Sequence, residues 1–340
     1  MTIVNLINYS NFNSEMNRLK FIDLFAGVGG IRLGFTRACQ SLGVECECVM
    51  SSEIDDKACA TYIKNFGEDP MLDITTVDEN DVPDCDVILG GFPCQAFSIA
   101  GKRGGFDDTR GTLFFDVARI IKAKRPKMFL LENVKGLLNH RSGQTIETIL
   151  NVLRNDLGYD VYCTLLNAKF FGVPQNRERI YIVGFDRCVD DFSISNSCSV
   201  MPCIYDILEN EPVDAKYYIS EKYYGTLKAH KDRHQQKGNG FGYDVRPMNG
   251  IANAVVCGGM GRERNLLCDP RRRYLSEEKN KDYIRKMTPR EWERLQGFPD
   301  DWTAGVADTH RYKQMGNSVA VPVIEAVSKK MIVCYGQING

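Results

Sequence analysis

Residues 19–30, which read LKFIDLFAGVGG, decide the fold of this chain. The first seven form a largely apolar run of the length of a buried strand, and the glycines that follow permit a tight turn and a close backbone approach to a ligand. Residues 31–42 then have the apolar spacing of an amphipathic helix. A buried strand, a glycine turn and a helix predict the first unit of a parallel sheet.

The same alternation continues through the first half of the chain. Short apolar runs predict further strands, and helical spacing predicts helices between them; the strands are expected at 45–51, 86–90, 127–131, 159–168 and 179–185, the helices at 56–66, 113–123 and 143–157. Strands that alternate with helices are typical of an α/β fold with a doubly wound, mostly parallel sheet, as in Rossmann-like proteins.

The pattern changes after residue 185. Residues 186–285 are polar, rich in turn residues and weakly periodic, so we expect a smaller, irregular domain there. Helices are expected at 288–296 and at 319–335, the second returning to pack on the first domain. The predicted division is therefore 1–185 plus about 310–340 for one domain, and about 186–309 for the second domain and the hinge.

Composition indicates an ordinary soluble protein. The chain has 340 residues, 43% hydrophobic and 26% charged, and no apolar run approaches the length of a membrane span. The opening twenty residues lack the pattern of a secretory signal, so we expect a leader before the first strand and a cytoplasmic location. Thirteen cysteines are then expected to be reduced thiols, and four scattered histidines predict no metal site.

Charge is distributed unevenly along the chain. Residues 1–110 hold 9 basic and 17 acidic side chains, whereas residues 111–340 hold 34 basic and 27 acidic ones. A polyanion is therefore expected to meet the second part of the chain.

Three short motifs carry the candidate chemistry. Cys94 follows a proline in GGFPCQ (90–95), Glu132 begins the triplet ENV, and Arg177 and Arg179 belong to QNRER (175–179). A thiolate that adds to C6 of cytosine turns the ring into an enamine, whose C5 can accept an electrophilic methyl group. That route needs a nucleophile, a group that protonates or hydrogen-bonds N3, and a methyl donor.

The glycine turn is the candidate donor site. A GxGxxG dinucleotide motif would need glycine at position 32, where the chain has Arg32, so the turn fits a nucleoside better than a pyrophosphate. Glu53, at the end of the second strand, lies where such folds place a carboxylate on ribose hydroxyls. Asp73 follows the next segment and is a candidate acceptor for an adenine amino group.

Taken together, these motifs resemble the bacterial DNA (cytosine-5) methyltransferases of restriction-modification systems. The likeness runs in the family's order from about Phe21 to Val323 and includes DLFAGVGG, GFPCQAFS, ENVKGL, QNRERIYIVGF, RKMTPREWERLQGFPDDW and QMGNSVAVPV. It implies S-adenosylmethionine as the donor, S-adenosylhomocysteine as the product, and no metal.

The resemblance also implies roles for individual residues. Cys94 attacks C6, Glu132 contacts N3 and the exocyclic amine of a flipped cytosine, and Arg179 assists at the O2 edge. For Arg177 a structural salt bridge is as good an interpretation as a substrate contact, while Arg290 and Glu293 are expected to brace the hinge. The expected donor pocket comprises Phe25, Ala26, Gly27, Gly29, Gly30, Glu53, Ile54, Asp73, Pro93, Asn317 and Ser318.

Duplex DNA is the expected partner of a monomeric protein. Residues 96–111 resemble a mobile lid that carries Ser98, Lys102, Arg103 and Arg110 toward the DNA, with a plain surface loop as the alternative. Arg262 and Arg264, within a glycine-rich run, are the candidates for reading bases. A restriction endonuclease would be a functional partner, not necessarily a physical one.

Two departures from the family and three alternatives stay open at this point. Ile54 stands where many relatives carry an aromatic residue beside the donor adenine, and Ala100 where some carry a serine. A tRNA cytosine-5 methyltransferase shares the catalytic motifs. A nicotinamide-dependent oxidoreductase with a redox-active Cys94 is disfavoured by the missing glycine, and a catalytically silent DNA-binding protein by the presence of Cys94, Glu132 and Arg179.

Overall fold

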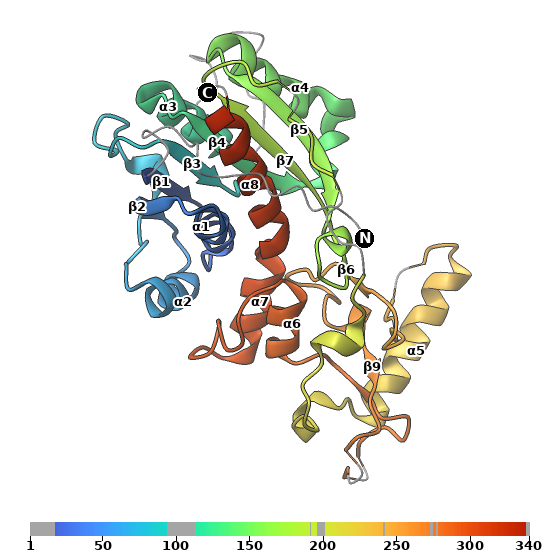
Figure 1. The fold of residues 1–340 in the computed structure, drawn as a ribbon. Helices are drawn as coiled ribbons and strands as arrows, with labels where there is room; N and C mark the ends of the chain where they lie inside the picture. The colour runs from blue at the N-terminus through green and yellow to red at the C-terminus, as the bar shows by residue number, and fades with distance from the viewer. Residues whose placement is uncertain are drawn as a thin grey trace, which may run out of the picture.

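The computed structural model describes residues 18–93, 113–190, 192–195, 201–240, 242–272, 275–276 and 278–337. Figure 1 shows a sheet with helices on both faces, and below it a smaller, irregular part built around short strands and α5. The last helix, α8, crosses the front of the sheet after the chain has passed through the lower part.

Six strands form the main sheet in the order β2-β1-β3-β4-β7-β5. Their bounds are β1 Arg18–Leu24, β2 Glu45–Ser52, β3 Val87–Gly90, β4 Met128–Val134, β5 Asp160–Asn167 and β7 Glu178–Phe185. The first four pair in parallel, whereas β7 runs antiparallel to both of its neighbours, β4 and β5. The mostly parallel sheet expected from the sequence is confirmed, with an antiparallel edge.

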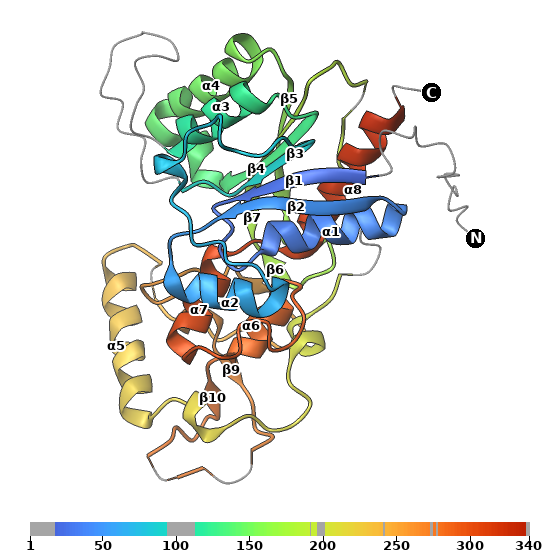
Figure 2. The same ribbon diagram turned by 90° about the vertical axis from the view of Figure 1, so that its left-hand side faces the viewer.

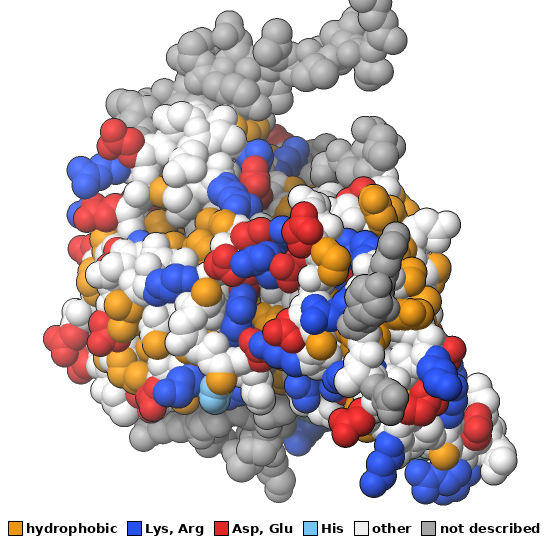
Figure 3. Space-filling model, turned by 90° about the horizontal axis from the view of Figure 1, so that it is seen from below, with side chains coloured by type: hydrophobic (Ala, Val, Ile, Leu, Met, Phe, Trp, Pro, Cys, Tyr) orange, Lys and Arg blue, Asp and Glu red, His pale blue; other side chains and the backbone are white. Residues whose placement is uncertain are grey.

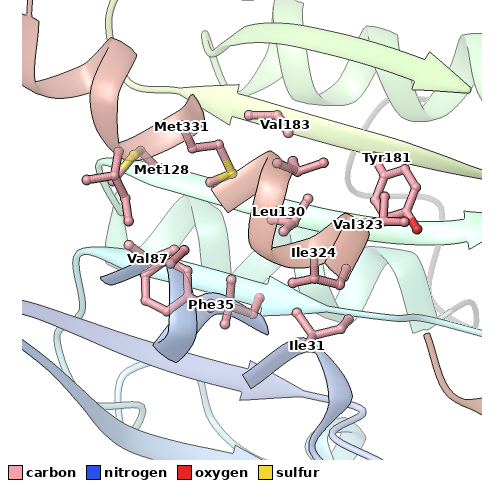
Figure 4. Close-up of a cluster of buried hydrophobic side chains, with 14 of the residues drawn as sticks. Ile31, Phe35, Val87, Met128, Leu130, Tyr181, Val183, Val323, Ile324 and Met331 are labelled. Atoms are coloured by element: carbon pink, nitrogen blue, oxygen red, sulfur yellow. The ribbon is translucent and has the colours of Figure 1, made fainter. Parts of the chain in front are cut away.

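Helices cover both faces of this sheet. The helices α1 (Gly30–Leu42) and α8 (Val321–Gln337) pack on one face, and α3 (Leu113–Lys124) and α4 (Gln144–Asn151) pack on the other. Figure 4 shows apolar side chains of α1 and α8 meeting those of β3, β4 and β7. At Gly34 a Cβ atom would lie 2.6 Å from Ile324, so the two helices touch through backbone on one side.

The lower part contains α5 (Glu221–Gln236), α6 (Pro289–Leu295), α7 (Asp308–Asn317) and four two-residue strands. These strands are β6 Gln175–Asn176, β8 Ala252–Asn253, β9 Leu267–Cys268 and β10 Ile284–Arg285; β6 pairs with β8 and β9 with β10. The helix α2 (Asp56–Phe66) lies beside α7 (Figure 2), and Gln314 of α7 donates to the carbonyl of Lys57 at 2.7 Å.

Short 3-10 turns connect these elements. They span Ile74–Thr76, Lys135–Leu138, His140–Gly143, Ala168–Phe170, Ile204–Ile207, Ala215–Tyr217 and Glu263–Asn265. After α4 the helix widens into a π turn, Val152–Asp156, where the sequence predicts one continuous helix.

Two helices of the lower part, α7 and α5, are absent from the sequence expectation. In α5 only Tyr224 and Leu227 are buried, so the helix has almost no apolar face. Its start is nevertheless encoded, because Ser220 caps it by accepting from the Tyr223 amide. By contrast α6 was predicted, and it begins with the Thr288–Glu291 capping box.

Ion pairs connect the segments of the lower part, both in its interior and at its surface. The guanidinium of Arg285, fully buried, binds Asp269 at 2.7 Å and Glu291 at 2.7 Å. Arg290 contacts Glu209 and Asp301, and in Figure 3 acidic and basic side chains interleave on the face seen from below. The structure thus gives Arg290 ion-pair partners, as a bracing role would need.

Three surveys of the described residues complete the fold. Within them, no helix combines the length and apolarity that crossing a membrane requires. The eleven cysteines that they include are all free thiols. No group of three or more potential metal ligands occurs in these same parts of the chain.

Candidate active site

A cavity of about 780 Å³ lies at the carboxyl ends of β1, β2, β3 and β4. The chain leaves β1 toward β2 on one side and places β3 on the other, so the cavity lies at the point where the strand order reverses, the usual ligand position in such sheets. Most of the predicted site residues line it: Phe25, Ala26, Gly27, Gly30, Glu53, Ile54, Asp73, Pro93, Glu132, Arg177, Arg179, Asn317 and Ser318.

The glycine turn forms one wall of the cavity. Phe25 and Gly27 both have left-handed backbone conformations, with φ of 55° and 56°, and a bulky residue adopts such a conformation rarely. Gly30 has no room for a Cβ, which would lie 2.7 Å from the Ser318 hydroxyl. The turn is therefore packed directly on the segment that ends α7.

Gly29 has a different place. It is not among the described residues that line the cavity, and a Cβ there would lie 2.1 Å from the ring of Phe66. Gly29 is the N-cap residue of α1 and has a left-handed φ of 79°. Gly29 therefore shapes the turn from behind.

The carboxylate of Glu53 organises the same turn. It accepts three backbone N–H groups, from Gly27, Ile54 and Asp55, each at 2.8 Å. An ionised carboxylate has about four acceptor positions, so capacity for a ribose hydroxyl remains. Asp73 lies across the cavity and accepts from the amide of Thr75 at 3.0 Å; hydrogen bonds from Thr75 lower the pKa of its carboxyl.

The side chain of Ile54 is 68% exposed and faces the cavity, an unusual position for a large aliphatic group. With Phe25 it gives this part of the cavity apolar surface beside the carboxylates. Such a combination fits a nucleoside whose ring is held by apolar contact and whose hydroxyls bind acids. The residues present therefore fit the donor expected from the sequence.

Glu132 and Arg179 meet because of the register between β4 and β7. Glu132 lies opposite Tyr181, so Arg179, two residues earlier on the antiparallel strand, is its diagonal neighbour on the same face. The Arg179 Nε lies 3.2 Å from the Glu132 Oε1. Burial raises the pKa of the Glu132 carboxyl, and the two arginines, Arg179 and Arg177, oppose that rise.

Arg177 has no carboxylate partner among the described residues. Arg177 is only 3% exposed, and its guanidinium donates to the carbonyls of Val255 at 2.7 Å, of Gly316 at 3.4 Å and of Ser318. Burial, together with neighbouring Arg179, lowers its pKa to about 9. Its contacts join two backbone segments, one at Val255 and one at 316–318, which a salt bridge would not do.

Asn133, which the sequence analysis left without a role, positions the loop after β3. Its amide donates to the Phe92 carbonyl at 2.8 Å, and its oxygen accepts from the Val134 amide at 2.9 Å. The ENV triplet thus fixes the backbone one residue before Pro93. The sequence signal for this role was a polar residue, Asn133, at the end of an apolar strand, and the structure shows that it is buried.

The recognition candidates follow a segment of the lower part that lines the cavity. Val256 and Cys257 line it, whereas Arg262 and Arg264, five and seven residues after Cys257, are not among its described lining residues. The Arg262 guanidinium lies 5.4 Å from the Tyr312 ring centre, whereas Arg264 is exposed. Its loop is held by Asn265, whose oxygen accepts from the Asn253 amide at 2.8 Å.

Five predicted site residues lie outside the described residues: Cys94, Ser98, Lys102, Arg103 and Arg110. The site is therefore described up to Pro93, the residue directly before Cys94.

A comparison with protein families identifies the chain. The model of the C-5 cytosine-specific DNA methylases matches residues 19–333. The chain belongs to this family. The methylase uses S-adenosylmethionine as its donor, as members of the family do.

Its similarity to individual proteins covers almost the whole chain. The methylase is 54% identical to the Type II methyltransferase M.HpaII of Haemophilus parainfluenzae, over 97% of this chain and 95% of the relative. It is 48% identical to M1.ScrFI of Lactococcus lactis subsp. cremoris and 47% identical to M.SsoII of Shigella sonnei, over 94% of this chain and 79% and 82% of those relatives.

Solved structures share the fold of the methylase. The S. pombe Dnmt2 methyltransferase superposes with a TM-score of 0.71 at 21% identity, covering 95% of this chain and all of that one. A putative DNA modification methyltransferase from an E. coli prophage gives 0.64 at 23% identity, with the same coverages. The family match favours DNA over tRNA as the substrate and excludes the oxidoreductase alternative.

Proposed function

We propose that this methylase modifies C5 of a cytosine flipped out of a short, specific site in duplex DNA, with Cys94 as the nucleophile. This proposal is supported by one cavity that is lined by the donor turn, by the Glu132–Arg179 pair and by Pro93, which directly precedes Cys94. A base stacked in a duplex cannot present C6 to a thiolate, so the cytosine must leave the helix, at a cost of a few kcal/mol.

Each catalytic side chain has a specific task. The Cys94 sulfur forms a bond to C6, and the ring electrons move toward N3. Glu132, whose pKa is raised by burial, shares its proton with N3 as negative charge develops there. Arg179, held against Glu132, orients that carboxyl and lies at the O2 edge of the base.

The donor supplies an electrophilic methyl group, which C5 accepts. Glu53 and Asp73 hold its ribose and adenine amine, and Ile54 and Phe25 cover the ring. Removal of the C5 proton then restores the aromatic ring as the Cys94–C6 bond breaks. Arg177 takes no part in proton transfer and fixes the backbone around the site.

DNA is proposed to bind between the sheet and the lower part. Figure 2 shows the carboxyl ends of the parallel strands and α5 on the same side of the molecule. Residues 186–309 would then form the recognition domain, with Arg262 and Arg264 toward the bases, and Ser98, Lys102, Arg103 and Arg110 on phosphates. We further propose a monomer in the bacterial cytoplasm that protects host DNA from a restriction endonuclease, in line with its Type II relatives.

The decisive test uses a trapped complex. Duplex DNA with 5-fluorocytosine should form a covalent adduct with the wild-type protein in the presence of donor, because fluorine cannot leave as a cation. Cys94→Ser should form no adduct and lose methyl transfer, yet bind S-adenosylhomocysteine with wild-type affinity. Bisulfite sequencing of DNA from a host that lacks cytosine methylation identifies the site. Adducts with Cys94→Ser, or turnover near the wild-type rate, would exclude Cys94 as the nucleophile.

A further inference from the structure

Two glutamines outside the catalytic set, Gln175 and Gln296, connect the recognition region to the donor wall. Both side chains are fully buried. Gln175 belongs to β6, two residues before Arg177, and Gln296 is the C-cap residue of α6. A buried amide loses more by an unmade hydrogen bond than it gains by a made one, so a pair of them is retained only where every group has a partner.

The two amides form one continuous chain of hydrogen bonds. The Gln175 Oε1 accepts from the Val255 amide at 3.0 Å, and its Nε2 donates to the Gln296 Oε1 at 3.0 Å and to the Leu295 carbonyl at 2.9 Å. The Gln296 Nε2 donates in turn to the Met315 carbonyl at 2.8 Å. Since the Val255 N–H can only donate and the Met315 carbonyl can only accept, these hydrogen bonds are satisfied with a single orientation of both amides.

The two ends of this series of hydrogen bonds, Val255 and Met315, lead to two different walls of the cavity. Val255 precedes Val256 and Cys257, which line it from the recognition side. Met315 precedes Gly316, Asn317 and Ser318, which line it from the donor side. Arg177 donates to carbonyls at both ends, Val255 and Ser318, and so runs parallel to the amide chain.

The same two walls also touch directly. A Cβ at Gly316 would lie 2.4 Å from the Cys257 backbone nitrogen and 2.6 Å from the Val256 carbonyl carbon. Movement of the 255–257 backbone therefore displaces the backbone at 315–318. Packing this close transmits a shift instead of absorbing it.

We infer that Gln175 and Gln296 are positioning residues that couple DNA binding by the recognition region to donor binding. This inference rests on the proposed function. DNA that orders the segment after Val255 places the turn at 315–318 for the donor, and bound donor prepares the recognition segment for DNA. The coupling is reciprocal, as thermodynamic linkage requires.

The experiment measures this coupling directly. The probes are S-adenosylhomocysteine and a duplex oligonucleotide with the site that the wild-type protein itself methylates. Calorimetry gives the Kd of S-adenosylhomocysteine with and without this DNA, and the ratio is the coupling factor. Replacing each glutamine by methionine keeps the volume and removes the hydrogen bonds. For both Gln175→Met and Gln296→Met we expect the coupling factor to fall about fivefold or more toward one.

A matched control separates coupling from stability. Asn280 is also a buried amide, and it binds the carbonyls of Ile219 at 2.7 Å and Ile284 at 2.8 Å, all within the lower part and away from the cavity. Asn280→Leu is expected to lower the melting temperature while it keeps the wild-type coupling factor. If Gln175→Met does not fold, Gln296→Asn, whose amide is one carbon shorter, is expected to show the same loss.

Kinetics give a second readout. In both glutamine variants the KM for S-adenosylmethionine should rise while kcat in saturating donor and DNA stays within about threefold, since binding and not chemistry is affected. The inference is overturned if the glutamine variants keep the wild-type coupling factor, if Asn280→Leu loses as much, or if the wild-type protein shows no coupling. Absence of any DNA methylation by the wild-type protein would instead refute the proposed function.

Discussion

Asp23, directly before the donor turn, should make the stability of this protein fall as pH rises. Its carboxyl is fully buried, its Oδ1 has no hydrogen-bond partner among the described residues, and Tyr62 donates to Oδ2 at 3.3 Å. Burial raises the pKa of this carboxyl from its usual 3.8 to about 7, against the opposing effect of Arg32. The folded chain therefore holds a proton that the unfolded chain releases.

The size of the effect follows from the pKa difference. Each unit corresponds to about 1.4 kcal/mol, so about three units cost roughly 4 kcal/mol once both states are ionised. Between pH 4 and 7 the unfolded state binds fewer protons than the folded state, so the free energy of unfolding falls as pH rises through this window. The loss is complete about one pH unit above the folded-state pKa.

Asp23→Asn removes the titrating group and keeps the shape. Urea unfolding of both proteins from pH 5 to pH 8 should show that the variant gains stability over the wild type by about 2–3 kcal/mol across this range. A constant offset from the new amide does not affect this slope. The control is Asp81→Asn, whose side chain is exposed and should leave the profile unchanged. A difference between Asp23→Asn and wild type that does not vary with pH would refute the reasoning.

Three further predictions concern the site. Glu132→Gln should bind donor and DNA but slow single-turnover methyl transfer by about 10²–10⁴, because an amide cannot share a proton with N3; an unchanged rate would show a structural role. Glu53→Gln, which leaves one of three backbone N–H groups facing an amide donor, should weaken S-adenosylhomocysteine binding about tenfold in calorimetry. Arg264→Ala should lose about 1–3 kcal/mol of discrimination at one base pair of the site, which bisulfite sequencing of a library of site variants measures. Lys102→Ala should instead weaken binding to DNA of every sequence and reduce the salt dependence of that binding, as salt titrations would show. If Arg264→Ala keeps the wild-type site preference, that arginine contacts phosphate.

The sequence predicted the sheet well because its strands are apolar and its turns carry glycine. Residues 19–30 predicted β1, the turn and α1. The antiparallel register between β4 and β7, which brings Glu132 next to Arg179, was not predicted. The fold class and the family are confirmed. The roles of Cys94 and the DNA-contacting residues stay predictions, as do the domain boundaries.

What the sequence did not predict depends on contacts between distant segments. The polar helix α5 has no apolar periodicity to reveal it, although Ser220 marks its start. The hydrogen bonds of Arg177 to carbonyls 78 and more residues away were not predicted, whereas its contact with the substrate stays a prediction. Gln175 and Gln296 meet across 121 residues, and no local pattern encodes that meeting.

The packing of α8 on α1 also sets the order in which this protein can fold during synthesis. The helix α1 ends at Leu42, while α8, which completes the same apolar cluster, begins at Val321. At roughly 5–20 residues per second, the ribosome needs some tens of seconds to cover that distance. During this time the apolar side chains that α8 covers, such as Phe35 of α1 and Leu130 of β4, stay without that cover. Nascent chains are therefore most exposed to aggregation and proteolysis just before α8 emerges, and a chain released early would carry a complete donor turn on an unfinished domain.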